Sequence, residues 1–213
     1  VIGMADGLTV PFALAAGISG AVDSIQIIVT AGLAEIAAGS IAMGLGGYLA
    51  ARTSEEHYDN ERKRELYEID NLNDREKQET TEIFKSYGMT DTQIESIVAT
   101  ISQDKQKWAD FMMRYELGLE KPDVTRAPKS AFTIGVSYII GGLIPLAPYM
   151  LITNNIHLAL ATSSIATLTA LTIFGAIKGK LMGTPPLKAA IQTVLVGGLA
   201  ATVAYSIAAY ISK

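Results

Sequence analysis

The chain contains no cysteine among its 213 residues. This absence excludes disulfides, catalytic thiols and thiolate metal sites, so a metal ligand here must be an oxygen, an imidazole or a thioether. Glu-x-x-His pairs, which hold iron in helical di-iron proteins, are also absent, because neither His57 nor His157 lies three residues after a glutamate. The sequence therefore argues against a di-iron oxidase.

Charge is scarce outside the middle of the chain. Lysine and arginine number 17 and aspartate and glutamate 21, yet only seven of these residues lie outside residues 52–129. A soluble domain would scatter charge over its whole surface, so the pattern indicates a membrane protein with one aqueous insert. The seven outlying charges are Asp6, Asp23, Glu35, Lys178, Lys180, Lys188 and Lys213.

Five apolar stretches are long enough to cross a bilayer as helices, which takes about 20 mainly apolar residues each. They cover residues 1–21, 25–51, 131–152, 156–177 and 187–211. We therefore predict an all-α polytopic membrane protein with five transmembrane helices per protomer. Its predicted parts are helices one and two (1–52), a cytosolic helical insert (53–128) and helices three to five (129–213).

The positions of lysine and arginine predict the orientation. The insert and the loop between the fourth and fifth spans, which holds Lys178, Lys180 and Lys188, lie on one side of a five-span protein and carry all of these residues except Lys213. Basic loops stay in the cytosol, so we expect a cytosolic N-terminus and insert and a lumenal C-terminus. The insert has more acidic than basic side chains, which does not favour a nucleic-acid partner.

Two acidic residues, Asp6 and Glu35, lie inside predicted spans, where a carboxylate costs about 2.5 to 3.5 kcal/mol. Such a residue indicates a substrate or proton pathway. Met43 follows Glu35 on the same helix at a rotation of about 80° and a step of about 12 Å, so both can border one path. Carboxylates combined with a thioether suit a divalent transition metal. The alternatives are that Asp6 caps a half-helix, Glu35 pairs with a polar neighbour and Met43 fills the core.

The insert reads as three helices. The pattern of the second span stays helical past His57, breaks at residues 71–74 and resumes to about Tyr87. After a turn at residues 88–90, Thr90 and Gln93 form a capping-box pair that starts a third helix running to about Leu117.

Glutamates recur three residues apart on the first two of these helices, so the two side chains of each pair lie on the same face of their helix. Two facing pairs make an oxygen-rich cavity that a third helix could close, and it would suit ferrous iron, zinc, manganese or cobalt. The alternatives are a solvated charged face and methionines that pack in a core. The candidate ligands are Glu65, Glu68, Glu76, Glu79, Met112, Met113 and Glu116.

Three stretches around the glutamate-rich insert, ADGLTVPFALAAGISGA, GLAEIAAGSIAMGLGGYLAARTSEEHY and GGLIPLAPY, resemble the vacuolar iron transporter family, and in particular its plant members. The resemblance covers nearly the whole chain. It implies a homodimeric ferrous iron/proton antiporter that moves Fe²⁺, with other divalent transition metals as further candidates, from the cytosol through the vacuolar membrane. The translocation path would lie between the two protomers.

Carried over to matching positions, the resemblance implies that Asp6, Glu35 and Met43 line the path and that the seven insert residues form a cytosolic metal-binding domain. Metal ions and protons would be substrates in a lipid bilayer, with no catalytic cofactor and no enzymatic activity. Two other classes stay open at this point: a non-transporting membrane scaffold whose acidic helices dock a partner, and a membrane di-iron carboxylate oxidase.

Overall fold

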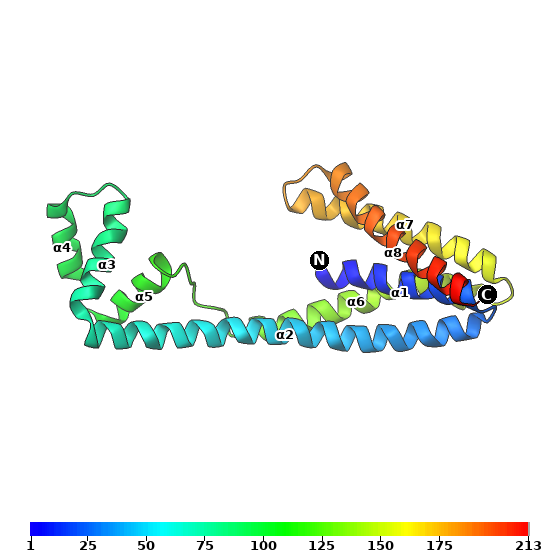
Figure 1. Cartoon of the computed structure of the whole chain (residues 1–213), viewed down its shortest axis with the longest axis horizontal. Helices are drawn as coiled ribbons and strands as arrows, with labels where there is room; N and C mark the ends of the chain where they lie inside the picture. Colours follow the sequence, from blue (N-terminus) through cyan, green and yellow to red (C-terminus); the bar gives the residue numbers. More distant parts are fainter. Residues whose placement is uncertain (213) are drawn as a thin grey trace. The chain divides into compact units, whose positions relative to one another are not determined.

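The computed structural model describes residues 1–212, which form eight α-helices and no strand (Figure 1). Lys213, which the orientation argument used, lies outside the described residues. The chain divides into two compact units, one formed by Val1–Tyr48 with the segment from Pro128 to the C-terminus and the other by Leu49–Ala127. The helices are α1 (Ile2–Ala21), α2 (Ile25–Asn71), α3 (Asn73–Ser86), α4 (Asp91–Ile101), α5 (Lys105–Tyr115), α6 (Arg126–Leu151), α7 (Ile156–Leu181) and α8 (Pro186–Ile211).

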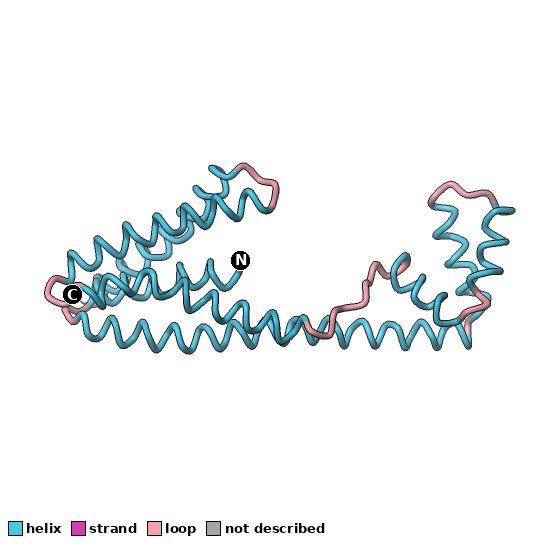
Figure 2. The backbone as a smooth tube through the Cα atoms, turned by 180° about the vertical axis from the view of Figure 1, so that it is seen from behind, coloured by secondary structure: helices cyan, strands magenta, loops and turns pink. Residues whose placement is uncertain are grey.

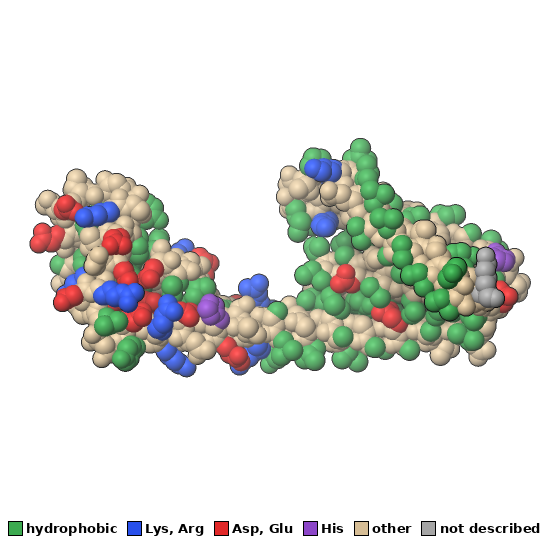
Figure 3. Space-filling view, in the orientation of Figure 1, with side chains coloured by type: hydrophobic (Ala, Val, Ile, Leu, Met, Phe, Trp, Pro, Cys, Tyr) green, Lys and Arg blue, Asp and Glu red, His purple; other side chains and the backbone are tan. Residues whose placement is uncertain are grey.

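Five of the described helices, α1, α2, α6, α7 and α8, are long and apolar enough to cross a membrane. This confirms the five predicted spans. Large apolar side chains such as Ile41, Phe132 and Val196 remain exposed on them, which is typical of helices that face lipid. In Figure 3 apolar side chains are spread over this unit, whereas charged side chains gather on the other one.

In the first unit, α1 packs against α7 and α8, and α7 packs against α8. Glycines allow α1 to approach α6 closely, because a Cβ atom on Gly7 would lie 2.4 Å from the Tyr138 carbonyl oxygen. Helix α6 continues through Pro145 and Pro148, and the Ser163 hydroxyl of α7 donates to the Pro145 carbonyl oxygen at 2.6 Å. The main core cluster consists of Ala15, Ile28, Ile36, Leu146, Tyr149 and Ala159.

The second unit packs the C-terminal part of α2 with α3, α4 and α5 around a small core. Its centre is Trp108, which is fully buried and is the chain's only tryptophan. Figure 2 shows α3 and α4 joined by a loop, where Gly88 has a φ of 81°, a conformation that favours glycine. The core residues are Ile69, Trp108, Ala109 and Met112, with Leu66, Ile83, Ile101 and Phe111 packed against them.

The helix boundaries in this unit agree with the sequence except at one place. The break after α2 and the capping box of Thr90 and Gln93 are confirmed. The predicted single third helix is wrong, because residues 102–104 separate α4 from α5. The Asp104 side chain accepts hydrogen bonds from the backbone N–H groups of Gln106 and Lys107 at 3.1 and 3.2 Å, and this N-cap starts a new helix.

Replacing Asp104 with Ala should destabilise the second unit by about 1 kcal/mol, because two N–H groups of α5 lose their acceptor. Thermal unfolding of the full chain, followed by the fluorescence of Trp108, measures the effect. Gln103→Ala, at the exposed neighbouring position, is the control. Equal unfolding temperatures for the two variants would show that the cap is not needed.

Candidate functional site

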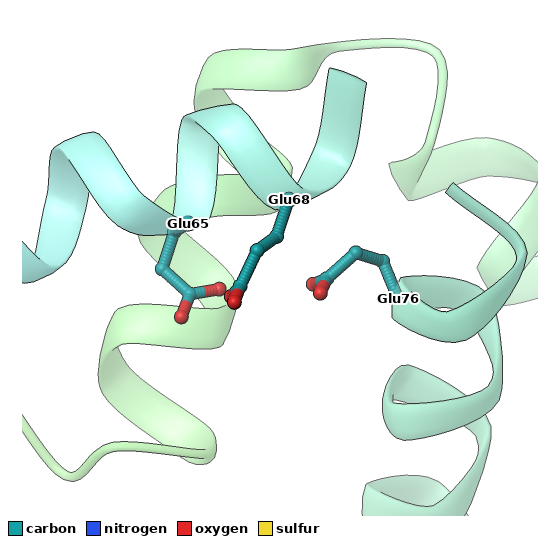
Figure 4. Close-up of side chains that lie close together, drawn as sticks. All are labelled: Glu65, Glu68 and Glu76. Carbon is teal, nitrogen blue, oxygen red and sulfur yellow. The ribbon is translucent and has the colours of Figure 1, made fainter. Parts of the chain in front are cut away.

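Three glutamates of the second unit meet at one point (Figure 4). Glu65 and Glu68 project from one face of α2, and Glu76 points toward them from α3. One carboxylate oxygen from each lies within 4.8 Å of the others, a spacing that could hold a metal ion. Glu65 and Glu76 are each only 1% exposed. Their Oε2 atoms are buried and have no hydrogen-bond partner among the described residues.

Burial also perturbs the acidity of this cluster. Loss of water raises the pKa of Glu65 to about 7, and the charges of Glu116 and Glu68 add to the effect. It raises the pKa of Glu76 to about 8, with further contributions from Glu65 and Glu79. The pKa of Glu116 is raised by burial and then by Glu79 and Glu68. The five predicted glutamates therefore lie within electrostatic range of one another, and we call them the glutamate cluster: Glu65, Glu68, Glu76, Glu79 and Glu116. A bound dication would favour their ionised forms.

Two arginines contact the carboxylates of this cluster. Arg75 Nε donates to Glu79 Oε1 at 2.9 Å. Arg64 lies 3.8 Å from both Glu65 Oε1 and Glu68 Oε2. These ion pairs are typical of the charged face that the sequence analysis gave as an alternative, but they leave the two buried Oε2 atoms without a hydrogen-bond partner.

Both methionines that were predicted as ligands are buried. Met112 belongs to the core around Trp108, and its Sδ lies 3.4 Å from the Thr80 hydroxyl oxygen. Trp108 Nε1 donates to the same oxygen at 2.8 Å. Met113 is 1% exposed. These contacts favour packing for Met112, and metal ligation by either thioether stays a prediction.

In the first unit, Glu35 of α2 accepts a hydrogen bond from the Tyr138 hydroxyl of α6. The other carboxylate oxygen, Oε2, is buried and has no hydrogen-bond partner among the described residues. Asp6 of α1 is partly buried and interacts electrostatically with Tyr138. Met43, also partly buried, lies about two turns further along α2. The structure thus pairs Glu35 with Tyr138, leaves Asp6 in electrostatic range of the same tyrosine, and places Met43 at another level of α2.

Tyr138 is a residue that the sequence argument missed. Its hydroxyl fits against Gly39, since a Cβ atom there would lie 2.5 Å from the tyrosine oxygen. The available signal was a tyrosine inside an apolar span, because a buried phenol usually has a hydrogen-bond partner. Its identity as the partner of Glu35 depends on how α2 and α6 pack, which the sequence does not encode locally.

The sequence of the chain is similar to those of known proteins. A family model described as the VIT family matches residues 1–209. The chain belongs to the VIT family. Vacuolar iron transporter 1 of Arabidopsis thaliana is 51% identical over 208 residues, which cover 98% of this chain and 83% of that protein.

Two further VIT family relatives extend the comparison. Vacuolar iron transporter 1 of Oryza sativa subsp. japonica is 51% identical over 208 residues, 98% of this chain and 82% of that protein. Protein CCC1 of Saccharomyces cerevisiae is 38% identical over 215 residues, 96% of this chain and 66% of that protein. The family resemblance predicted from the sequence is confirmed, and the two plant relatives are named as transporters, not enzymes.

Without metal, the second unit of this VIT family member should lose stability as the pH rises. In the folded state the pKa of Glu65 is about 7 and that of Glu76 is about 8, so each carboxyl stays protonated up to that pH. In the unfolded chain both carboxyls have the ordinary pKa of 4.5. The folded state therefore binds more protons inside this window, and the free energy of unfolding falls by up to about 1.4 kcal/mol per pH unit and carboxyl.

Unfolding of the full chain in the presence of a chelator, followed by Trp108 fluorescence at about pH 5 and about pH 9, measures this dependence. The double variant Glu65→Gln, Glu76→Gln should flatten it. Glu120→Gln, at a carboxyl that is 77% exposed, should leave it unchanged. Stability that rises with pH in the unmodified protein would contradict the assigned protonation of the two buried carboxyls.

Tyr138→Phe removes the donor to Glu35 and should destabilise the membrane unit by about 1 to 3 kcal/mol, because a buried carboxylate loses its partner. The thermal unfolding temperature of the purified protein in detergent measures this loss. Tyr205→Phe, at a more exposed tyrosine of α8, is the matched control. If both variants unfold at the same temperature, the hydroxyl of Tyr138 does not support Glu35.

Proposed function

We propose that this chain is a ferrous iron/proton antiporter that moves Fe²⁺ from the cytosol into the vacuole. One observation carries the proposal: Glu35 in a membrane helix and Glu65 and Glu76 in the second unit each bury a carboxylate oxygen that has no hydrogen-bond partner among the described residues. Such groups cost stability unless a cation or proton occupies them. The names of the plant relatives, vacuolar iron transporters, supply the substrate and the membrane.

Residues 53–128, which nearly coincide with the second unit (Leu49–Ala127), are proposed as a cytosolic metal-binding domain. The five glutamates of its cluster offer oxygen ligands that suit Fe²⁺ and also Mn²⁺, Co²⁺ and Zn²⁺, and the thioethers of Met112 and Met113 would favour the softer of these ions. The N-terminus would share the cytosolic side and the C-terminus would be lumenal. The metal is a substrate, so its binding here must be reversible.

In the membrane part, Asp6, Glu35 and Met43 are proposed to line the path between the two protomers of a homodimer. Tyr138 fixes one oxygen of Glu35, which leaves Oε2 to take either a proton or a metal ion. A carboxylate that exchanges the two ligands couples their movements, because one must leave before the other binds. Met43, at a different depth along α2, would add a soft ligand on the same route.

The energetics favour proton exchange. Moving two positive charges into a lumen that is positive by 100 mV costs about 4.6 kcal/mol, and returning two protons cancels this charge movement. Each pH unit of lumenal acidity then contributes about 1.4 kcal/mol per proton. An electroneutral exchange would thus be driven by lumenal acidity and by the Fe²⁺ gradient, and the membrane potential would not oppose it.

Purified protein in liposomes with an acidic lumen should take up Fe²⁺ and make the lumen more alkaline, under anaerobic conditions and without forming Fe³⁺. Glu35→Gln keeps the shape of the side chain but cannot titrate, so it should reduce both signals at least about tenfold. Asp23→Asn, which changes an exposed loop charge, should retain them. A non-transporting scaffold predicts no flux in any variant, an oxidase predicts Fe³⁺, and normal coupled exchange by Glu35→Gln would refute the proton role.

A further inference from the structure

The glutamate cluster of the second unit is contacted by two permanent cations. Arg75 Nε lies 2.9 Å from Glu79 Oε1. Arg64 pairs at 2.8 Å with Glu61, outside the cluster, and also lies 3.8 Å from oxygens of both Glu65 and Glu68. Their influence reaches further, since Arg75 interacts electrostatically with Glu68 and Glu76, and both arginines interact with Glu116. Every glutamate of the cluster therefore interacts electrostatically with at least one guanidinium.

These arginines differ from the carboxylates in one chemical respect. A guanidinium cannot lose its proton in proteins and has no acceptor atom, so it can neither ligate a metal nor become neutral. Its charge stays beside the cluster at every pH at which the protein works. A dication that enters the cluster must therefore meet two positive charges, and the oxygens of Glu65, Glu68 and Glu79 that the arginines contact can ligate it only when a guanidinium moves away.

The two arginines are exposed enough for a metal ion to replace them at the carboxylates. The side chains of Arg64 and Arg75 are 50% and 65% exposed, so water can receive each guanidinium when it leaves a carboxylate. Only the arginine side of each pair is exposed, since the side chains of Glu65, Glu68 and Glu79 are 1%, 23% and 26% exposed. By contrast, Arg62 on the same stretch of α2 pairs with Asp110 at 3.1 Å and with Gln106, neither of which belongs to the cluster.

We propose that Arg64 and Arg75 act as built-in competitors of the metal, which hold the cluster carboxylates until a dication displaces them and which speed its release. The inference rests on the proposed metal-binding role of the second unit, and it identifies two residues that lower the affinity of that unit for metal. A domain that hands its metal on must bind it loosely, and a cation that re-pairs with the ligands lowers affinity without removing any ligand.

The full chain in detergent tests this with Zn²⁺ alone as the probe, by calorimetry near pH 8 and by the rate at which a chelator removes the bound ion. Arg64→Gln and Arg75→Gln should each bind Zn²⁺ about two- to fivefold more tightly and release it more slowly, and the double variant should show the larger effect. Arg64→Lys and Arg75→Lys keep the charge and should return affinity toward that of the unmodified protein. Arg62→Gln, outside the cluster, should change neither quantity.

The outcomes separate this inference from the proposed function. If the unmodified protein binds Zn²⁺ and the glutamine variants bind it equally or more weakly, the competitor role is refuted and the metal site stands. If the unmodified protein binds no Zn²⁺, the proposed metal-binding domain fails, and this inference fails with it. The fluorescence of buried Trp108 verifies folding, and either single variant decides the question if the other does not fold.

Discussion

Taking a carboxylate out of water costs free energy unless a donor or a cation replaces the water, and this constraint governs both candidate sites. Glu35 receives one donor, the Tyr138 hydroxyl, for two oxygens. Glu65 and Glu76 are almost fully buried close to further negative charges, and each keeps one oxygen without a hydrogen-bond partner among the described residues. In both units the fold thus positions oxygen ligands that a proton or a metal ion can complete.

The core of the second unit contacts the helix that carries Glu76. Trp108 on α5 donates to the Thr80 hydroxyl, and that hydroxyl lies 2.7 Å from the carbonyl oxygen of Glu76, one turn earlier on α3. Thr80 thus links α3 to α5, and Glu76 lies on the same helix, where its side chain points toward Glu65 and Glu68 of α2. The apolar core and the acidic cluster therefore share helix α3.

Local signals predicted most of the fold, and long-range contacts account for what was missed. The five spans follow from hydropathy, and the capping box at Thr90 follows from short-range spacing. The break before α5 was missed because Asp104 is one acidic residue among many, and its capping role shows only in its backbone partners. Spacing identified the E-x-x-E pairs to which the three meeting glutamates, Glu65, Glu68 and Glu76, belong. The Glu35–Tyr138 bond joins residues far apart in the sequence, so spacing could not predict it.

Proton release on metal binding is the most direct test of whether the buried carboxyls hold a dication. Anaerobic Fe²⁺ is added near pH 7 to the full chain in weakly buffered detergent solution, and the released protons are titrated. Protons should be released upon binding, because near pH 7 Glu76 is mostly protonated and Glu65 about half protonated, and both must ionise to act as ligands. Binding without proton release, or release that persists after both residues are changed to Gln, would contradict this expectation.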